Sequence, residues 1–245
     1  MKPLLVLGIA FGASLLGSMS GGSSSALTTP AWLAMGVPLP TAVATDKVAG
    51  ALWTLLGARN CLRRRTVDWP LIVGMAALGL AGAWFGTDIT VRLDPEVLKR
   101  GVGAAILMLI AVMLARPVLG REPGPARLSR PVVAAAAVPL GLYEGMLGSG
   151  NSLIATLLFC TGRGYDLIAA LGHYYLLAFA WCALAAAAYI SRGYYDVALM
   201  IPATIGSCAG GFLGSRIASE RGTAFVRGLF VLSGTALGVK LLMGW

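Results

Sequence analysis

The chain has few charged residues. Only 12% of its 245 residues are Asp, Glu, Lys or Arg, whereas soluble domains carry roughly 25%. Hydrophobic residues make up 58% of the chain, and the mean hydropathy is +0.81. Stretches such as Leu71–Phe85 and Val132–Leu142 have no polar face, which a helix on the surface of a soluble domain would need. This scarcity of charge argues against a soluble α/β domain.

The chain also lacks the regular alternation of polar and apolar residues that membrane β-barrels show. Its apolar runs are continuous instead. Because a bilayer accepts only helices or closed barrels, we expect an all-α, polytopic integral membrane protein of about 8–10 membrane segments.

Several motifs of enzymes and pumps are missing. No G-x-x-x-x-G-K-[ST] sequence is present, so we do not expect this chain alone to pump with ATP. The four cysteines have neither CxxC spacing nor nearby histidines, and we expect small apolar packing residues: Cys61, Cys160, Cys182 and Cys208. No metal-ligand cluster appears either. We therefore expect no cofactor and no metal.

The net charge of +9 does not indicate a nucleic-acid partner, because most of the Lys and Arg residues lie in short connections between apolar segments. The positive-inside bias places such connections in the cytoplasm. We expect a multi-pass protein of the bacterial inner (cell) membrane, with two cytoplasmic connections marked by Arg59, Arg63, Arg64 and Arg65 and by Arg116, Arg121, Arg127 and Arg130.

The chain resembles itself at an offset of 128 residues. The pairs include Gly17 with Gly145, Gly22 with Gly150, Ser24 with Ser152, Trp53 with Trp181, and Asp68 with Asp196. We therefore predict a membrane repeat at 1–119, a cytoplasmic linker at 120–131 and a second repeat at 132–245. The N-terminal stretch MKPLLVLGIAFGASLLGSMS imitates a secretory signal, but it has a counterpart in the second repeat, so we expect a retained helix.

Each repeat contains five apolar segments. They are predicted at 3–19, 23–36, 40–57, 69–91 and 101–119, and at 132–147, 151–162, 166–190, 197–215 and 225–243. The second segment of each repeat is short: Ser23–Gly36 reaches about 21 Å, against about 30 Å of hydrocarbon. We expect these to be broken half-helices that begin inside the membrane. An odd number of crossings per repeat makes the repeats inverted and an even number makes them parallel; we favour inverted repeats, as in many transporters.

The two breaks read GSMSGGSSSALTTP and GMLGSGNSLIATLL. A helix that begins inside the membrane points its free N–H groups and the positive end of its dipole at the protein interior, which favours an anion. Serines 23–25 can cap such a helix, and small residues also allow close helix packing, as at Gly74, Gly79, Gly82 and Gly86. The substrate-binding candidates at the breaks are Gly21, Gly22, Ser23, Ser24, Gly148, Gly150, Asn151 and Ser152.

Polar residues inside apolar segments are further candidates, because burying them in a membrane is costly. We expect Thr45 and Lys47 to contact the anion, and Asp46, Glu144 and His173 to couple transport to protons. Asp46 and Lys47 point about 100° apart on a helix, so they should not pair with each other. The alternatives are that Asp46 and Lys47 reach the membrane surface and that the single histidine is simply hydrogen-bonded.

These residues resemble the TauE/SafE family of sulfite exporters over essentially the whole chain. The likeness rests on the glycine-rich break, on a basic loop, and on Pro30, Gly36-Val37-Pro38, Ala42, Thr45 and Val67-Asp68-Trp69. The second half departs from it, with Leu158 and His173 where the repeat would place Pro30 and Thr45. The resemblance implies an inner-membrane transporter of small anions such as sulfite or organosulfonates, and its partners would be that anion and the lipid bilayer.

The leading hypothesis is therefore a secondary transporter, not an enzyme, that exports a small anion. One alternative is an intramembrane serine hydrolase, although the sequence around Ser20 reads Ser18-Met19-Ser20-Gly21 and not G-x-S-G. The other is a channel or a non-transporting membrane scaffold, which would conduct without saturation or not conduct at all.

Overall fold

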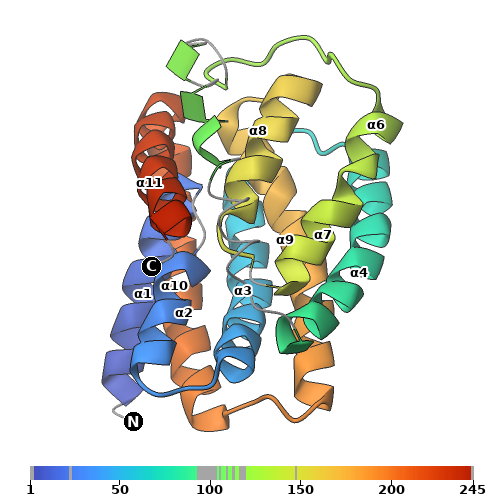
Figure 1. Cartoon of the computed structure of the whole chain (residues 1–245). Coiled ribbons are helices and arrows are strands. Elements are labelled where there is room, and N and C mark those ends of the chain that lie inside the picture. The colour runs from blue at the N-terminus through green and yellow to red at the C-terminus, as the bar shows by residue number, and fades with distance from the viewer. Residues whose placement is uncertain are drawn as a thin grey trace.

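A computed structural model of the chain describes residues 3–21, 24–92, 120–146 and 148–243, with further positions between 104 and 115. Within these residues the chain forms helices and no strand (Figure 1). The predicted all-α class is confirmed for this part of the chain. The predicted segment 101–119 lies mostly outside the described residues.

The helices follow the predicted order, except that the single segment predicted at 132–147 is divided into two helices at Ala136. Those before residue 100 are α1 (Pro3–Ser20), α2 (Ser25–Ala34), α3 (Leu39–Leu62) and α4 (Trp69–Arg92). Those after residue 120 are α6 (Arg130–Ala135), α7 (Ala137–Met146), α8 (Asn151–Arg163), α9 (Leu167–Ser191), α10 (Val197–Arg221) and α11 (Thr223–Met243). By length and composition, four helices of the described part could cross a membrane: α1, α4 to Thr90, α9 and α10.

The apolar pattern located the helices but ended two of them too early. Helix α3 continues to Leu62 instead of residue 57, and α10 continues to Arg221 instead of residue 215. A helix can extend beyond the apolar run, because its backbone hydrogen bonds do not depend on hydropathy. Helices α9 and α10 begin where Asp166 and Asp196 accept hydrogen bonds from backbone N–H groups two and three residues later, as N-cap residues do.

The two short helices each form one arm of a helical hairpin (Figure 1). Helices α1 and α2 start and finish at one end of the bundle and turn back near its middle, whereas α7 and α8 do so from the opposite end. Gly21, Gly148 and Gly150 have positive φ angles of 66°, 71° and 86°, a conformation that costs glycine little. The glycines are therefore needed at the tips of the hairpins.

The long helices α3 and α9 pack along each other at the centre, between two flanking pairs. Helix α1 packs along α10 on one side, and α7 packs along α4 on the other. Each hairpin thus packs against a long helix from the other half of the chain.

Glycines allow both flanking pairs to approach closely. A Cβ atom on Gly86 would overlap the backbone of Leu142, and one on Gly210 would overlap the backbone of Phe11. Other glycines that face the backbone of the paired helix are Gly82, Gly141, Gly145, Gly206 and Gly214. These contacts are the small-residue packing that membrane helices use in place of a hydrophobic driving force.

The expected packing role is confirmed for three of the four glycines named for it. Gly82 and Gly86 face α7, and Gly79 lies against the indole ring of Trp181. The expectation is wrong for Gly74, where an added Cβ would meet nothing within 4 Å. The spacing of these glycines in the sequence does not show which face of α4 packs against another helix.

Arginines and aspartates join several connections at one end of the bundle. Asp68 accepts from Arg130 at 3.0 Å and from Arg163 at 3.3 Å, and Arg65 pairs with Asp166 at 3.2 Å. Burial raises the pKa of Asp68, but the hydrogen bonds from Arg130 and the Leu71 backbone and the charges of Arg130 and Arg163 together outweigh burial and leave that pKa below its usual value. The basic loop after α3 and the linker before α6 therefore lie at the same end of the molecule.

The packing predicts opposite effects for two glycines of α4. Gly86→Ala should force α4 and α7 apart, at a cost of about 1–3 kcal/mol. Gly74→Ala should be neutral or stabilising by up to about 1 kcal/mol, because alanine favours a helix and space is available. Thermal unfolding in detergent would compare the two variants with the parent chain. Equal melting temperatures for both variants would contradict the close α4–α7 contact.

Candidate functional site

A small polar cavity lies at the centre of the bundle, where both hairpin tips approach α3 and α9. Its volume is about 30 Å³, which is room for about one water molecule. It has therefore no room for a larger solute in this conformation. The lining residues are Ser24, Ser25, Asp46, Lys47, Gly50, Trp53, Thr54, Glu144, Ser152, Tyr174, Tyr175, Ala178 and Cys182.

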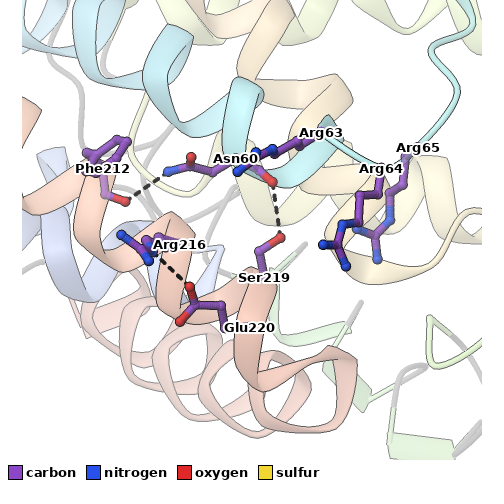
Figure 2. A pocket seen from close by; sticks show the side chains of 8 residues that line it. All are labelled: Asn60, Arg63, Arg64, Arg65, Phe212, Arg216, Ser219 and Glu220. Atoms are coloured by element: carbon purple, nitrogen blue, oxygen red, sulfur yellow. Dashed lines mark hydrogen bonds and ion pairs between the residues drawn. The ribbon is translucent and has the colours of Figure 1, made fainter.

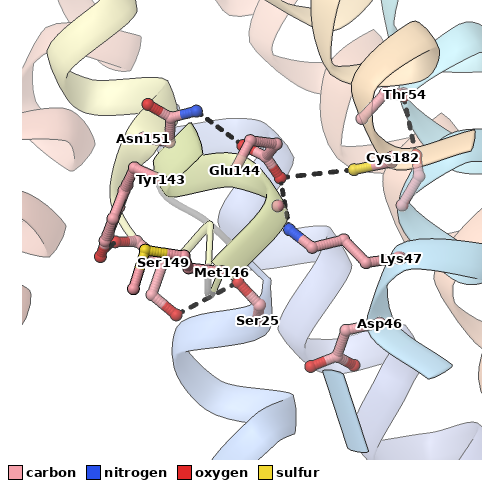
Figure 3. Close-up of polar contacts among 12 residues, drawn as sticks. Ser25, Asp46, Lys47, Thr54, Tyr143, Glu144, Met146, Ser149, Asn151 and Cys182 are labelled. Carbon is pink, nitrogen blue, oxygen red and sulfur yellow. Dashed lines mark hydrogen bonds and ion pairs between the residues drawn. The ribbon is translucent and has the colours of Figure 1, made fainter. Parts of the chain in front are cut away.

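A buried ion pair dominates the cavity (Figure 3). Lys47 Nζ on α3 lies 2.8 Å from Glu144 Oε1 on α7, and the two residues are only 3% and 4% exposed. Removing two charges from water costs several kcal/mol per ion unless attraction and hydrogen bonds offset the loss. The predicted surface alternative for Lys47 is therefore wrong, because its ammonium group points into the protein.

Three further side chains hold the carboxylate of Glu144. Its Oε2 accepts hydrogen bonds from Asn151 Nδ2 at 2.7 Å and from the Tyr174 hydroxyl at 2.8 Å. Its Oε1 accepts a longer one from Cys182 Sγ at 3.3 Å. Together with Lys47 these donors come from α3, α8 and α9, so one carboxylate on α7 connects four helices.

Asp46 points away from Lys47, as the helical geometry predicts. Its carboxylate accepts hydrogen bonds from Thr29 Oγ1 at 2.6 Å and from Trp32 Nε1 at 2.9 Å, both on α2. The residue is partly exposed and lines the cavity. Asp46 thus joins the first hairpin to α3, whereas Lys47 joins α3 to the second hairpin.

The starts of α2 and α8 meet at the cavity. Ser25 Oγ, in the first turn of α2, lies 3.3 Å from Ser149 Oγ in the turn before α8. Ser24 makes no side-chain capping hydrogen bond, so the predicted capping role of this serine is wrong. Ser152 is 2% exposed, and its Oγ has no hydrogen-bond partner among the described residues. Each half-helix start therefore brings a serine to the cavity.

Tyrosine side chains, from the hairpin itself or from α9, donate to backbone carbonyl groups at or next to the hairpin tips. Tyr143 donates to Ser149 O at 2.6 Å, and Tyr189 donates to Gly145 O at 3.0 Å. In the first hairpin, the Tyr175 hydroxyl donates to Ser18 O at 3.2 Å. In a low-dielectric interior these carbonyl groups would otherwise lack a donor. The tyrosines make the helix breaks possible there.

The structure brings several of the predicted site residues together. Ser24, Asp46, Lys47, Glu144 and Ser152 line the cavity. Asn151 contacts Glu144, and a Cβ on Gly148 would lie 2.5 Å from both Glu144 Oε1 and Lys47 Nζ. The glycine therefore leaves room for the ion pair. Gly22 and Ser23 lie outside the described residues.

Other predicted site residues lie apart from the cavity. A Cβ on Gly21 would meet Leu171 and Phe230, and one on Gly150 would meet Ile106 and Leu237, so these glycines serve the turns and the packing. Thr45 is fully buried and donates to Thr41 O of its own helix.

His173 is near the arginine-rich end of the bundle. Its Nε2 accepts a hydrogen bond from the backbone N–H of Asp68 at 3.3 Å, its Nδ1 is 2.7 Å from Ala169 O, and its ring lies against Tyr165. These contacts match the alternative of a hydrogen-bonded structural histidine, and the structure does not bring His173 to Lys47 and Glu144.

Tyr174 and Cys182 were not predicted as site residues. Tyr174 follows His173 directly, and the two consecutive tyrosines at 174 and 175 in the mostly apolar segment 166–190 were the available signal. Cys182 was expected only to pack, whereas its thiol also donates to Glu144. Neighbouring residues point about 100° apart on a helix, so the sequence alone did not favour the tyrosine over the histidine.

A bundle of apolar helices around a small polar cavity is typical of helical membrane transporters. The chain belongs to the TauE/SafE family, since the family model described as sulfite exporter TauE/SafE matches residues 6–241. The resemblance predicted from the sequence is thus confirmed.

Curated relatives cover nearly the whole chain. The probable membrane transporter protein ORF9 of a Sinorhizobium species is 30% identical over 241 residues, or 95% of this chain and 89% of that protein. A probable membrane transporter protein of Haemophilus influenzae is 26% identical, with 97% and 94% covered. YfcA of Escherichia coli K12, also a probable membrane transporter protein, is 26% identical, with 99% and 91% covered. No solved structure matches the chain significantly.

The family and these relatives are described as transporters, so the chain is a membrane transporter and not an enzyme. The serine hydrolase alternative is therefore excluded.

The ion pair predicts strong coupling between two substitutions. Lys47→Met should destabilise the protein by about 3–5 kcal/mol, because it leaves a buried carboxylate without its counter-charge. The double variant Lys47→Met/Glu144→Gln should be more stable than Lys47→Met alone, since no charge then remains. Thermal unfolding of the parent, both single variants and the double variant in detergent gives this coupling energy.

Glu220→Gln is the matched control, because its pair with Arg216 is exposed on α10 and should contribute less than about 1 kcal/mol. Additive effects of the Lys47 and Glu144 substitutions would contradict a direct pair.

Proposed function

We propose that this protein is a secondary carrier that exports a small anion, sulfite or an organosulfonate, across the bacterial inner membrane. The observation that carries the proposal is the meeting of two helix starts at a buried lysine. Helix N-termini favour anions, and Lys47, Ser24 and Ser152 line the same cavity. Paired broken helices at corresponding positions are typical of transporter binding sites.

The two halves are proposed to be inverted repeats of a multi-pass membrane protein. The reciprocal packing of α1 on α10 and of α7 on α4 supports this arrangement. The opposite directions of the two hairpins support it as well (Figure 1). Inverted repeats allow the same site to open to either side by exchanging the conformations of the two halves.

The arginine-rich end is proposed to face the cytoplasm. Its loop after α3 and its linker before α6 carry most of the arginines outside the helices, and the salt bridge between Arg130 and Asp68 joins them. A concentration of arginine in short connections is the usual mark of the cytoplasmic side.

The charges in the cavity imply that a proton accompanies the anion. Lys47 contributes one positive charge, whereas Glu144 and Asp46 can contribute two negative charges. An anion would meet net repulsion while both carboxylates are ionised. Protonation of Glu144 would remove its attraction for Lys47 and leave the ammonium group to the anion. Glu144 is therefore proposed as the main coupling residue, with Asp46 as the second candidate.

This coupling is compatible with export. A divalent oxyanion such as sulfite that moves with one proton still carries one net negative charge. The negative cell interior favours its exit by about 2.3 kcal/mol per 100 mV. A monovalent sulfonate that moves with one proton is electroneutral and follows the concentration gradients alone.

Exchange between liposome-trapped and external anions tests the proposal. The purified protein should show saturable exchange of labelled sulfite against a panel of sulfite, sulfoacetate, thiosulfate, sulfate, acetate and chloride. Ser152→Ala should raise the KM roughly tenfold or more, because one hydrogen bond to a charged ligand contributes about 1.5–3 kcal/mol. Saturation would also distinguish a carrier from a channel.

Ser14→Ala is the matched control. Ser14 is likewise buried and its Oγ has no partner among the described residues, but it lies on α1 and does not line the cavity. The absence of flux for every anion with folded protein would overturn the anion-carrier proposal. Equal effects of Ser152→Ala and Ser14→Ala on the KM would show that Ser152 does not contact the anion.

The pH dependence of exchange tests the coupling residue. In the parent protein the KM for sulfite should rise as the pH rises, because Glu144 then loses its proton and pairs with Lys47. Glu144→Gln should exchange anions with a KM that depends much less on pH, since glutamine imitates the protonated acid. An unchanged pH profile would exclude Glu144. Asp46→Asn and His173→Gln, measured in parallel, would show whether either residue is responsible instead.

A further inference from the structure

A second polar pocket lies at the arginine-rich end of the bundle, between the end of α3 and the end of α10 (Figure 2). Its volume is about 470 Å³, many times that of the central cavity. The residues that line it are Asn60, Arg63, Arg64, Arg65, Phe212, Arg216, Ser219 and Glu220. We refer to these eight residues as the arginine pocket.

The arginine pocket has an excess of positive charge. Arg216 is paired with Glu220 at 2.8 Å, and Arg65 is paired with Asp166. Arg63 and Arg64 are exposed and make no ion pair within the described part of the chain. Two guanidinium groups are therefore available for an anion. Guanidinium groups match the oxygens of an oxyanion with paired N–H donors.

Hydrogen bonds between α3 and α10 hold the floor of the arginine pocket. Asn60 Nδ2 donates to Phe212 O and to Ser215 Oγ, both at 3.0 Å. Ser219 Oγ donates to Asn60 O at 3.1 Å. The pocket is thus formed by two helices that are joined by hydrogen bonds, and Arg64 and Arg65 extend from the adjacent loop beside them (Figure 2).

Helix α3 lines both the arginine pocket and the central cavity. Asn60 lies in the former and Trp53 in the latter, about 10 Å apart along the helix. The indole of Trp53 packs edge-on against Tyr175 with 5.1 Å between ring centroids, and both residues are buried. A Cβ on Gly211 of α10 would lie 2.7 Å from the Trp53 ring. Trp53 and Tyr175 both line the central cavity, Trp53 on the same helix as Asn60.

We propose that the arginine pocket is a vestibule that binds the transported oxyanion before it passes Trp53 and Tyr175 to the central cavity. This inference rests on the proposed function for the identity of the ligand. A positively charged recess raises the local concentration of anions and speeds their capture. Phe212 is the single apolar side chain among its lining residues. That composition suits a free anion better than a lipid, whose acyl chains need an apolar groove.

Kinetics of exchange test the role of the vestibule. With sulfite added on the arginine-rich side, Arg63→Gln/Arg64→Gln should raise the KM about tenfold and leave kcat unchanged, because the central cavity is intact. The KM of the parent should rise with salt more steeply than that of the variant. Arg127→Gln, which removes an exposed arginine of the linker outside the pocket, should have no effect. An unchanged KM in the double variant, or an equal change in Arg127→Gln, would overturn the proposal.

A binding test that needs no transport separates this inference from the proposed function. Phenylglyoxal modifies accessible arginines, and peptide mass spectrometry measures the rate at each position. Sulfate, used as the probe, should slow the modification of Arg63 and Arg64 but not of Arg127, in the parent and equally in the more stable double variant Lys47→Met/Glu144→Gln. If sulfate protects Arg63 and Arg64 but the protein transports no anion, the carrier proposal is wrong and the arginine pocket is still an oxyanion-binding site.

The same labelling in vesicles of phosphatidylcholine alone, or with phosphatidylglycerol, distinguishes a lipid headgroup from a free anion. Protection by sulfate in the neutral vesicles would support the vestibule. Protection that requires phosphatidylglycerol and ignores sulfate would overturn it, as would no protection at all.

Discussion

The ion pair between Lys47 and Glu144 is the interaction on which the centre of the structure depends. A buried carboxylate is tolerated only where a counter-charge and hydrogen-bond donors replace its water. Here the replacements come from Lys47, Asn151, Tyr174 and Cys182. These residues lie on three different helices, α3, α8 and α9. Because the buried carboxylate of Glu144 on α7 needs these partners, it holds the four helices together at this point. The same partners add to the packing of α7 on α4 in holding the second hairpin in place.

The helix breaks depend on the same physical constraint. A hairpin tip inside a membrane exposes backbone carbonyl groups that no water can satisfy. Tyr143, Tyr175 and Tyr189 donate to such carbonyls, while their rings remain in the apolar interior. The glycine contacts of α4 with α7 and of α10 with α1 then bring the hairpins close to the long helices. Glycines form the turns, and tyrosines on neighbouring segments stabilise them.

The sequence predicted the helices well because continuous apolar runs and their lengths reflect the bilayer directly. Of the residues that it singled out at the breaks, Ser24 and Ser152 line the cavity and Asn151 contacts Glu144, whereas Gly21 and Gly150 serve the turns and the packing. It did not predict that Lys47 meets Glu144, since the two are 97 residues apart and nothing local connects them. The sequence also favoured His173 over its neighbour Tyr174 as a site residue, because an imidazole can titrate near neutral pH. Which of the two side chains points toward the cavity depends on helix packing, and the sequence does not show it.

The two polar sites along α3 hold positive charge in different ways, and the difference follows from the solvent around them. In the open arginine pocket, water screens Arg63 and Arg64, so these side chains need no fixed partner. In the central cavity little water is available, and Lys47 is stable only with its carboxylate. An anion can therefore associate with the pocket at any pH at which arginine is charged. Under the proposed function, an anion that binds Lys47 competes with Glu144, and a proton on Glu144 would decide that competition. On the proposed route, recognition by charge comes first and coupling to the proton second. The order is set by how much water each site retains.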